Sequence, residues 1–332
     1  MLTGKGAPTR VNLTIMKQFL CRLGSAVLVL AAATTSLSQT SALRLKKAVT
    51  LTATVTDRSG NFVIGLAPEA FKIADVNLVH PPTLSPDDEP LSVAILIDTS
   101  ASMQDPEVKE VARANPIIEA VNRFLELSNP KNEYFVMTFD RVPQILLDWR
   151  QDKKLPLVDV LPATDKHLTA LYDACSATLT KFKEAHHDKR AVLLFSDGLD
   201  SGSKTRYADL LRNLERTDVL VYALAPRAEH LTSDLKGILW GMITREGEQI
   251  LGEMVQATGG FVYYPETRRE LAAAAERIAV EMRHQYRLTF RAKSTGSQAA
   301  TLQRTKLEVT IPANAPAEMR KLKVRTRRYY AP

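Results

Sequence analysis

The sequence predicts an α/β protein with a Rossmann-like, doubly wound, mostly parallel sheet and a small accessory β domain built from N- and C-terminal strands. Short apolar strands alternate with helical stretches between residues 91 and 283, which is typical of a parallel sheet covered on both faces. The flanking segments, 45–80 and 284–332, show the period-two alternation of half-buried strands. Since each flanking segment needs a partner face, we expect the two to pack together beside the α/β domain.

Within the α/β region the predicted strands and helices follow one another along the chain. The strands are expected at 91–97, 134–139, 144–148, 191–196, 218–225 and 261–264, and the helices at about 106–128, 169–184, 204–215, 247–257 and 266–283. Asp105 and Pro106 are residue types preferred at a helix cap and at the first helical position, and Pro116 should kink that helix or restart it. Residues 226–246 form an insertion of uncertain structure.

The flanking β segments are separated from the α/β region by a proline-rich stretch. Residues 48–56, AVTLTATVT, alternate well, and FVIGL and FKIAD continue the β pattern after a DRSGN turn. The stretch HPPTLSPDDEP contains prolines and an acidic run, so residues 81–90 are predicted to be an exposed linker. The final strands are expected at 286–292, 306–312 and 321–330, the last of them basic with one solvated face.

The N-terminal 42 residues are predicted to be a signal peptide, with Met16 as an alternative start. A positive MKQFLCRLG precedes the apolar SAVLVLAAATTSL and a small-residue TSA site. The apolar run is shorter than the roughly 20 residues of a membrane helix, so no span is expected after cleavage, although a retained anchor is the alternative. We therefore expect a secreted, periplasmic or cell-envelope protein. Cys175 is then the one cysteine of the predicted mature chain, which excludes a disulfide within that chain, and its apolar pattern predicts a core residue.

The charge of the chain gives no reason to expect nucleic-acid binding. The formal net charge is +7, with 44 basic and 37 acidic residues. Lys5, Arg10, Lys17 and Arg22 lie in the predicted signal peptide, so 44 − 4 = 40 basic residues remain and the net charge falls to 40 − 37 = +3. This excess is too small to indicate a nucleic-acid partner.

Oxygen-bearing side chains follow the predicted strands at one edge of the sheet. Asp98, Ser100 and Ser102 leave the first strand, Thr169 precedes a helix, and Asp197 follows the strand 191–196. Ligands of open α/β sheets bind beyond the carboxyl ends of strands. Carboxylates and hydroxyls suit Mg²⁺, Mn²⁺ or Ca²⁺ rather than Zn²⁺ or copper. Taken singly, each motif is also explained as a helix cap or a turn.

Three of these motifs resemble those of von Willebrand factor A (vWA) domains. DTSAS resembles the DxSxS motif of the metal-ion-dependent adhesion site (MIDAS), and LTALYDA and LLFSDG resemble its second and third loops. ATGGFVYYPE and the two ends of the mature chain are similar to vWA-related secreted proteins of Acidobacteria. The chain departs from the family at Ala101, at His167-Leu168 and at Arg328, and at Ala74-Asp75-Val76, where the family has glycines or an acidic turn.

The resemblance implies a vWA domain at 91–283 that binds and does not turn over a substrate. It implies that a divalent cation, Mg²⁺ or else Mn²⁺ or Ca²⁺, is held by five ligands: Asp98, Ser100, Ser102, Thr169 and Asp197. It further implies that the open position of the cation captures an Asp or Glu of an unidentified protein partner. In many such domains the last helix, here 266–283, moves as the site changes occupancy.

We expect no enzymatic activity. The chain lacks the G-x-S-x-G, H-E-x-x-H, G-x-x-x-x-G-K-[ST] and G-x-G-x-x-G patterns. Three alternatives stay open: an envelope scaffold in which metal binding is incidental, a metal-assisted hydrolase with His167 as base, and a partner subunit of an ATP-driven machine. The predicted secretion signal argues against the last, because ATP is cytoplasmic.

Overall fold

The α/β domain is built on a six-stranded sheet with the strand order β6-β5-β4-β7-β8-β9. The computed structural model describes residues 48–73, 82–85, 88–100, 103, 116–153, 168–226, 235–291, 305–306 and 308–330. The predicted signal peptide lies outside them. The strands of this sheet are β4 (Leu91–Asp98), β5 (Glu133–Phe139), β6 (Pro143–Arg150), β7 (Lys189–Phe195), β8 (Val219–Leu224) and β9 (Val262–Tyr263).

The sheet is mostly parallel, as the sequence predicts. β4 pairs in parallel with β5 and β7, and β8 pairs in parallel with β7 and β9, whereas the edge strand β6 runs antiparallel to β5. Each residue of β4 is buried. Val93 and Ile95 face one layer of helices, while Ala94 and Leu96 face the other, so both faces of the strand are core.

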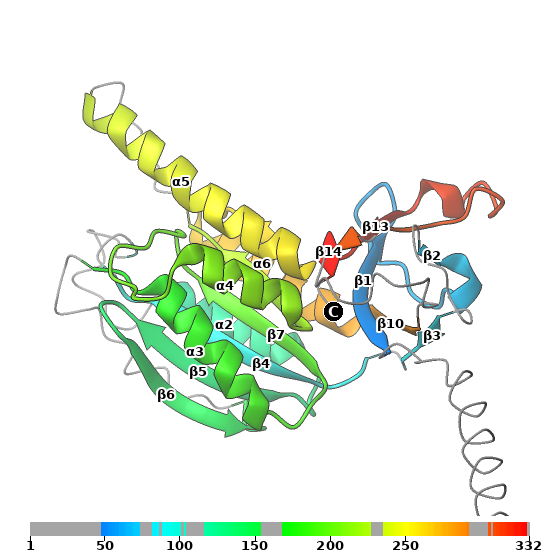
Figure 1. Ribbon diagram of the computed structural model, residues 1–332, viewed down its shortest axis with the longest axis horizontal. Coiled ribbons are helices and arrows are strands. Elements are labelled where there is room, and N and C mark those ends of the chain that lie inside the picture. Colours follow the sequence, from blue (N-terminus) through cyan, green and yellow to red (C-terminus); the bar gives the residue numbers. More distant parts are fainter. Residues whose placement is uncertain are drawn as a thin grey trace, which may run out of the picture. The chain divides into compact units, whose positions relative to one another are not determined.

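Helices cover both faces of this sheet (Figure 1). One face packs against α2 (Pro116–Leu127) and α6 (Arg268–Arg283), and the other against α3 (Leu171–Lys181), α4 (Tyr207–Arg216) and α5 (Leu235–Thr258). The predicted fold class is therefore confirmed. Cys175 is a buried free thiol in the second of these layers, as expected. No helix in the described ranges is both long enough and apolar enough to cross a membrane.

Two helices differ from their predicted bounds. The described part of the first predicted helix is α2, Pro116–Leu127. Residues 104–115 lie outside the described part of the chain, as does the expected cap at Asp105. α5 begins at Leu235, so the second half of the insertion 226–246 is helical.

The N- and C-terminal strands pair with each other in a second sheet, of order β13-β1-β10-β3. β1 lies between β10 and β13 and is antiparallel to both, and three of its residues, Leu51, Ala53 and Val55, are in a separate core. Two further pairs, β12–β2 and β11–β14, complete the accessory strands. Their bounds are β1 (Val49–Thr56), β2 (Lys72–Ile73), β3 (Thr83–Leu84), β10 (Tyr286–Phe290), β11 (Thr305–Lys306), β12 (Val309–Thr310), β13 (Lys323–Arg325) and β14 (Tyr329–Tyr330).

Two expectations for these flanking segments are wrong, and a third holds in part. The segment 81–90 is not a free linker, because β3 pairs with β10 and because Asp88 and Glu89 form ion pairs with Arg283 and Arg287. FVIGL is not a strand and contributes only an isolated bridge at Phe62. The charged face of the basic C-terminal segment is solvated at Lys321 and Lys323, whereas the Arg327 side chain, beyond β13, is buried and donates to the carbonyl of Thr217.

Candidate metal centre

Asp98 ends β4 at the carboxyl edge of the sheet and is 1% exposed. Its Oδ1 accepts a hydrogen bond from the backbone N–H of Ser100 at 2.9 Å, and its Oδ2 accepts one from the Ser196 hydroxyl at 2.7 Å. The next residue, Thr99, is fixed to the end of β5 because its N–H donates to the carbonyl of Phe139 at 2.9 Å. The first loop of the site therefore holds its carboxylate in one orientation at the centre of the sheet.

The third loop, residues 196–205, follows β7, the neighbour of β4. Ser196 links the two strands, since its hydroxyl donates to Asp98 and accepts from the N–H of Gly198 at 3.1 Å. Asp197 accepts from the N–H of Leu199 at 3.0 Å. Its carboxylate also lies close enough to raise the pKa of Asp98. The two carboxylates predicted as ligands thus lie close enough for the charge of Asp197 to act on Asp98.

Helix α5 packs directly on this third loop through a pair of glycines. A Cβ added to Gly198, which has φ +87°, would stand 2.4 Å from the carbonyl oxygen of Gly247, and one added to Gly247 would stand 2.3 Å from that of Asp197. Because no real Cβ approaches a backbone oxygen so closely, neither position accommodates a larger side chain without moving α5 or the loop. The backbone of Asp197 is therefore fixed from the helix side as well.

Thr169 lies in the second loop, residues 168–170, just before α3. It is buried, and the next residue, Ala170, donates its N–H to the carbonyl of Asp140 at 2.6 Å, immediately after β5. The three loops thus meet where β5, β4 and β7 end side by side. The structure places Asp98, Ser100, Thr169 and Asp197 at this one edge, while Ser102, Ala101 and His167 lie outside the described residues.

Burial raises the pKa of Asp98 to about 7, and the negative charge of Asp197 contributes in the same direction. Hydrogen bonds from Ser100 and Ser196 act against this rise, but they do not offset it. A buried carboxylate beside a second carboxylate is costly in its charged form unless a cation is near. Asp98 therefore fits a divalent cation better than it fits a purely structural role as a turn residue.

The donor set of the site is carboxylate and hydroxyl oxygen. Within the described ranges, no three or more side chains of His, Cys, Asp and Glu are grouped so as to hold a metal ion. A nitrogen- or sulfur-rich site of the zinc type is therefore not formed by these residues. Hard cations such as Mg²⁺, Mn²⁺ and Ca²⁺ match the oxygen donors that are present.

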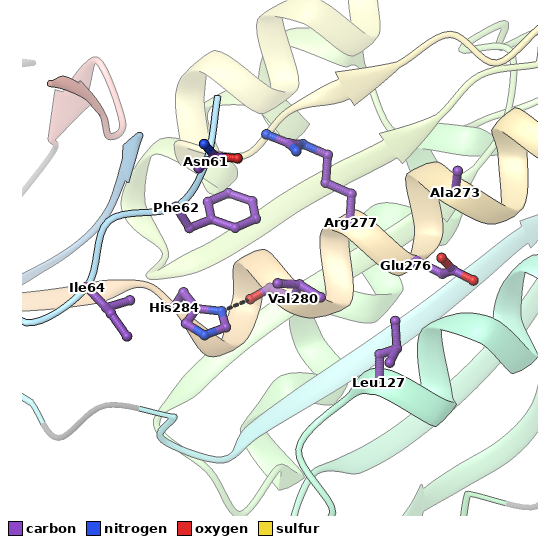
Figure 2. Close-up of a pocket in the computed structure, with 9 residues that line it drawn as sticks. All are labelled: Asn61, Phe62, Ile64, Leu127, Ala273, Glu276, Arg277, Val280 and His284. Atoms are coloured by element: carbon purple, nitrogen blue, oxygen red, sulfur yellow. Dashed lines mark hydrogen bonds between the residues drawn. The ribbon is translucent and has the colours of Figure 1, made fainter. Parts of the chain in front are cut away.

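An open pocket of about 500 Å³ lies elsewhere, where the turn after β1 and the end of α2 meet α6 (Figure 2). Figure 2 shows Phe62 between two side chains of the α6 region: the Arg277 guanidinium lies 4.9 Å from the centre of the Phe62 ring, and the His284 ring stacks on it at 6.3 Å. None of the predicted cation ligands lines this pocket. It therefore contributes nothing to the candidate metal centre.

Residues outside the predicted ligand set also shape the site. Ser196 orients Asp98, Gly247 accommodates the Asp197 backbone, and Asp200 and Ser203 contact the start of α3. The sequence carries a signal for some of them, because SDGLDSGS is rich in carboxylates and hydroxyls directly after a buried strand. Gly247 gives no such signal, since a lone glycine in a helical pattern does not reveal which backbone lies against it.

Residues 93–199 match the family model of the von Willebrand factor type A domain. The match extends from β4 to the third loop and includes Asp98, Ser100, Thr169 and Asp197. The chain therefore contains a vWA domain, and the predicted resemblance to this family is confirmed. The narrower Acidobacterial-type family stays a prediction. No curated protein sequence matches this chain.

Several solved structures are similar to this chain at low sequence identity. An aerotolerance-related membrane protein from Bacteroides fragilis is 18% identical, over 58% of this chain and 98% of that one, with a TM-score of 0.44. A von Willebrand factor type A protein from Catenulispora acidiphila is 13% identical, over 73% of this chain and 69% of that one, with a TM-score of 0.46. Proximal thread matrix protein 1 of the mussel byssus, with a zinc-occupied MIDAS motif, is 15% identical, over 65% of this chain and 50% of that one, with a TM-score of 0.44.

Proposed function

We propose that this protein is a metal-ion-dependent adhesion-type vWA protein, which binds a carboxylate-bearing protein ligand through a divalent cation at the carboxyl edge of its sheet. The residues that would hold the cation are Asp98, Ser100, Thr169 and Asp197, together with Ser102, which is predicted from the sequence. The observation that carries the proposal is Asp98, a buried carboxylate beside Asp197 that is held in place by two serines.

The role of each residue at the proposed cation site follows from its charge. Asp98 and Asp197 supply the negative charge, and Ser100 and Thr169 supply neutral oxygens. Ser196 and the N–H of Ser100 fix the direction of the Asp98 oxygens. A bound divalent cation would supply an open coordination position for an Asp or Glu oxygen of the partner. Mg²⁺ is the expected ion and Mn²⁺ or Ca²⁺ are the alternatives.

The first test is the thermal stability of the protein with and without a divalent cation. We expect millimolar MgCl₂ or MnCl₂ to raise the melting temperature and EDTA to reverse the rise, because a ligand at 100 times its Kd stabilises a protein by about 2.7 kcal/mol. Asp98→Ala should abolish the response. Asp57→Ala is the matched control, because Asp57 also accepts a backbone N–H, from Asn61, but in an accessory turn. A wild type whose melting is indifferent to Mg²⁺, Mn²⁺ and Ca²⁺ contradicts the proposal.

The second test concerns the partner. Immobilised wild-type protein should capture a protein from envelope extract in Mg²⁺ and release it in EDTA, and Asp98→Ala should capture none. A cation-dependent melting temperature without any EDTA-sensitive capture would instead support a scaffold role with incidental metal binding. Metal-dependent hydrolysis of a substrate panel would overturn the non-enzymatic assignment.

The proposal places the protein outside the cytoplasm, secreted or in the cell envelope. It rests on the predicted signal segment, which combines a positive stretch, an apolar run and a small-residue site. We expect the mature protein to begin near residue 43. Mass spectrometry of the N-terminal peptide from the native source checks this, and a mature protein that retains residues 16–42 would show an anchor instead.

A further inference from the structure

Helix α3 begins without a cap of its own. Ala170 occupies the N-cap position and offers no side-chain acceptor to the first turn. The first N–H groups of a helix need partners from outside it. Asp200 Oδ1 accepts from the N–H of Tyr172 at 3.1 Å, and Ser203 Oγ accepts from that of Asp173 at 3.0 Å. The third loop therefore caps α3 from another part of the chain.

The start of α3 in turn provides acceptors for the third loop. The Asp173 carboxylate accepts hydrogen bonds from the backbone N–H groups of Lys204 at 2.9 Å and Thr205 at 2.8 Å. Within the third loop, the Ser203 hydroxyl donates to Asp200 at 2.6 Å. The start of α3 and the third loop thus fix each other.

Both backbone polar groups of Thr169 are held by this loop. The Thr169 N–H donates to Ser201 Oγ at 3.0 Å, and its carbonyl accepts from the N–H groups of Ser201 at 2.9 Å and Gly202 at 3.0 Å. A Cβ added at Gly202 would stand 3.2 Å from the Cβ of Leu168. The family has glycines before the threonine, whereas here the glycine that relieves crowding with Leu168 lies on the opposite loop.

We propose that Asp200, Ser201 and Ser203 are positioning residues of the cation site, which fix the backbone of Thr169 relative to Asp197 without contacting the cation. This inference rests on the proposed function. Metal ligands must lie within about 0.2 Å of their proper distance. Thr169 precedes α3 and Asp197 follows β7, and the third loop carries both Asp197 and the groups that hold Thr169. One segment therefore sets the distance between two ligands.

The experiment measures Mn²⁺ affinity by calorimetry for wild type, Asp200→Ala, Asp200→Asn and Ser201→Ala, at a temperature where each is folded. We expect Asp200→Ala and Ser201→Ala to weaken Mn²⁺ binding by about 10–100-fold, the usual effect of removing a residue that orients a metal ligand. Asp200→Asn keeps the Oδ1 acceptor of the Tyr172 N–H and loses the charge and the long Oδ2 contact with the Ser203 N–H, so its affinity should stay closer to wild type. Asp57→Ala should leave the affinity unchanged, because Asp57 caps an accessory turn.

A second measurement, made without metal, accompanies the Mn²⁺ affinity measurement. In EDTA, hydrogen exchange of the Tyr172 amide should be faster in Asp200→Ala than in Asp200→Asn, because only the alanine variant lacks its acceptor. Should Asp200→Ala fail to fold, Ser201→Ala, which removes a single hydroxyl, carries the test.

Each result bears on one of the two claims. If wild type binds no divalent cation, the proposed function and this inference both fail. If wild type binds Mn²⁺ and both alanine variants bind it equally tightly, only the positioning role fails. If Asp200→Asn is as weak as Asp200→Ala, the effect does not come from the Oδ1 hydrogen bond to Tyr172 and the positioning role is overturned.

Discussion

Asp98→Asn is expected to make the cation-free protein more stable while it abolishes the response to Mg²⁺. The substitution keeps the size of the side chain and an acceptor for the Ser100 N–H, but it removes a buried negative charge beside Asp197. A rise of the pKa from 3.8 to about 7 corresponds to a penalty on the ionised form of about 4 kcal/mol. Removing it should raise the melting temperature in EDTA by several degrees at pH 7.5.

The pH dependence provides a check on the same carboxylate. The folded pKa of Asp98 lies above the unfolded one, so its contribution to stability is full below about pH 4 and is lost as the pH rises through about 7. In EDTA the difference in melting temperature between Asp98→Asn and wild type should therefore grow from pH 4 to pH 7. Saturating Mg²⁺ should reverse the order of the two proteins at pH 7.5, because only wild type binds it.

The control for Asp98→Asn is the same substitution at an exposed acid. Hydrogen bonds from Asn61 lower the pKa of Asp57, so Asp57→Asn should not stabilise the protein. If Asp98→Asn melts below wild type in EDTA at pH 7.5, the ionised carboxylate is a stabilising group, and the argument for a cation at this position loses its main support.

Arg325→Met is expected to destabilise the protein strongly. Glu281 of α6 is 1% exposed, and its carboxylate accepts from Thr54 in β1, Tyr222 in β8 and Arg325 in β13. Removal of the guanidinium leaves a buried carboxylate without a counter-charge, which typically costs about 3–5 kcal/mol. Urea denaturation of wild type and variant measures the change in the free energy of unfolding.

Replacing Glu281 by a neutral residue as well should restore most of the lost free energy of unfolding. In the double variant Glu281→Gln/Arg325→Met neither charge of this pair remains, so we expect it to be more stable than Arg325→Met alone. Arg123→Met is the matched control, because Arg123 pairs with Glu126 on the surface of α2 and such pairs contribute about 0–1 kcal/mol. An Arg325→Met variant that loses no more stability than Arg123→Met would show that this network does not anchor the accessory sheet.

The same network bears on the expected movement of α6. Besides Glu281, the helix is tied to the accessory segments by Arg277, which donates to the carbonyl of Gly60, and by Arg283, which pairs with Asp88. If α6 were displaced, these contacts would have to break, or the accessory segments would have to move with the helix. That the helix moves with occupancy of the site stays a prediction from the resemblance.

The central part of the fold follows from hydrophobic patterning in the sequence. β4 and β7 are continuous apolar runs because a strand between two helical layers is buried on both faces. β3 escaped prediction because its two residues lie among prolines, and only pairing with β10 makes them a strand. The start of α5 was not predicted, because a helix with little amphipathic pattern cannot be distinguished from an irregular insertion in the sequence.

The sequence by itself determined the sheet, the order of its strands along the chain and the residue types at their carboxyl ends, because burial and hydrogen-bonding chemistry are written in local patterns. It also indicated Asp98, Ser100 and Thr169 as neighbours, since parallel strands bring their ends to one edge. Only the tertiary structure decided that Asp200 and Ser203 cap α3, that Gly247 lies against Asp197, and that Arg325 meets Glu281. These contacts join segments far apart in the chain, and no local pattern records which backbone or charge a side chain will meet once the layers have packed.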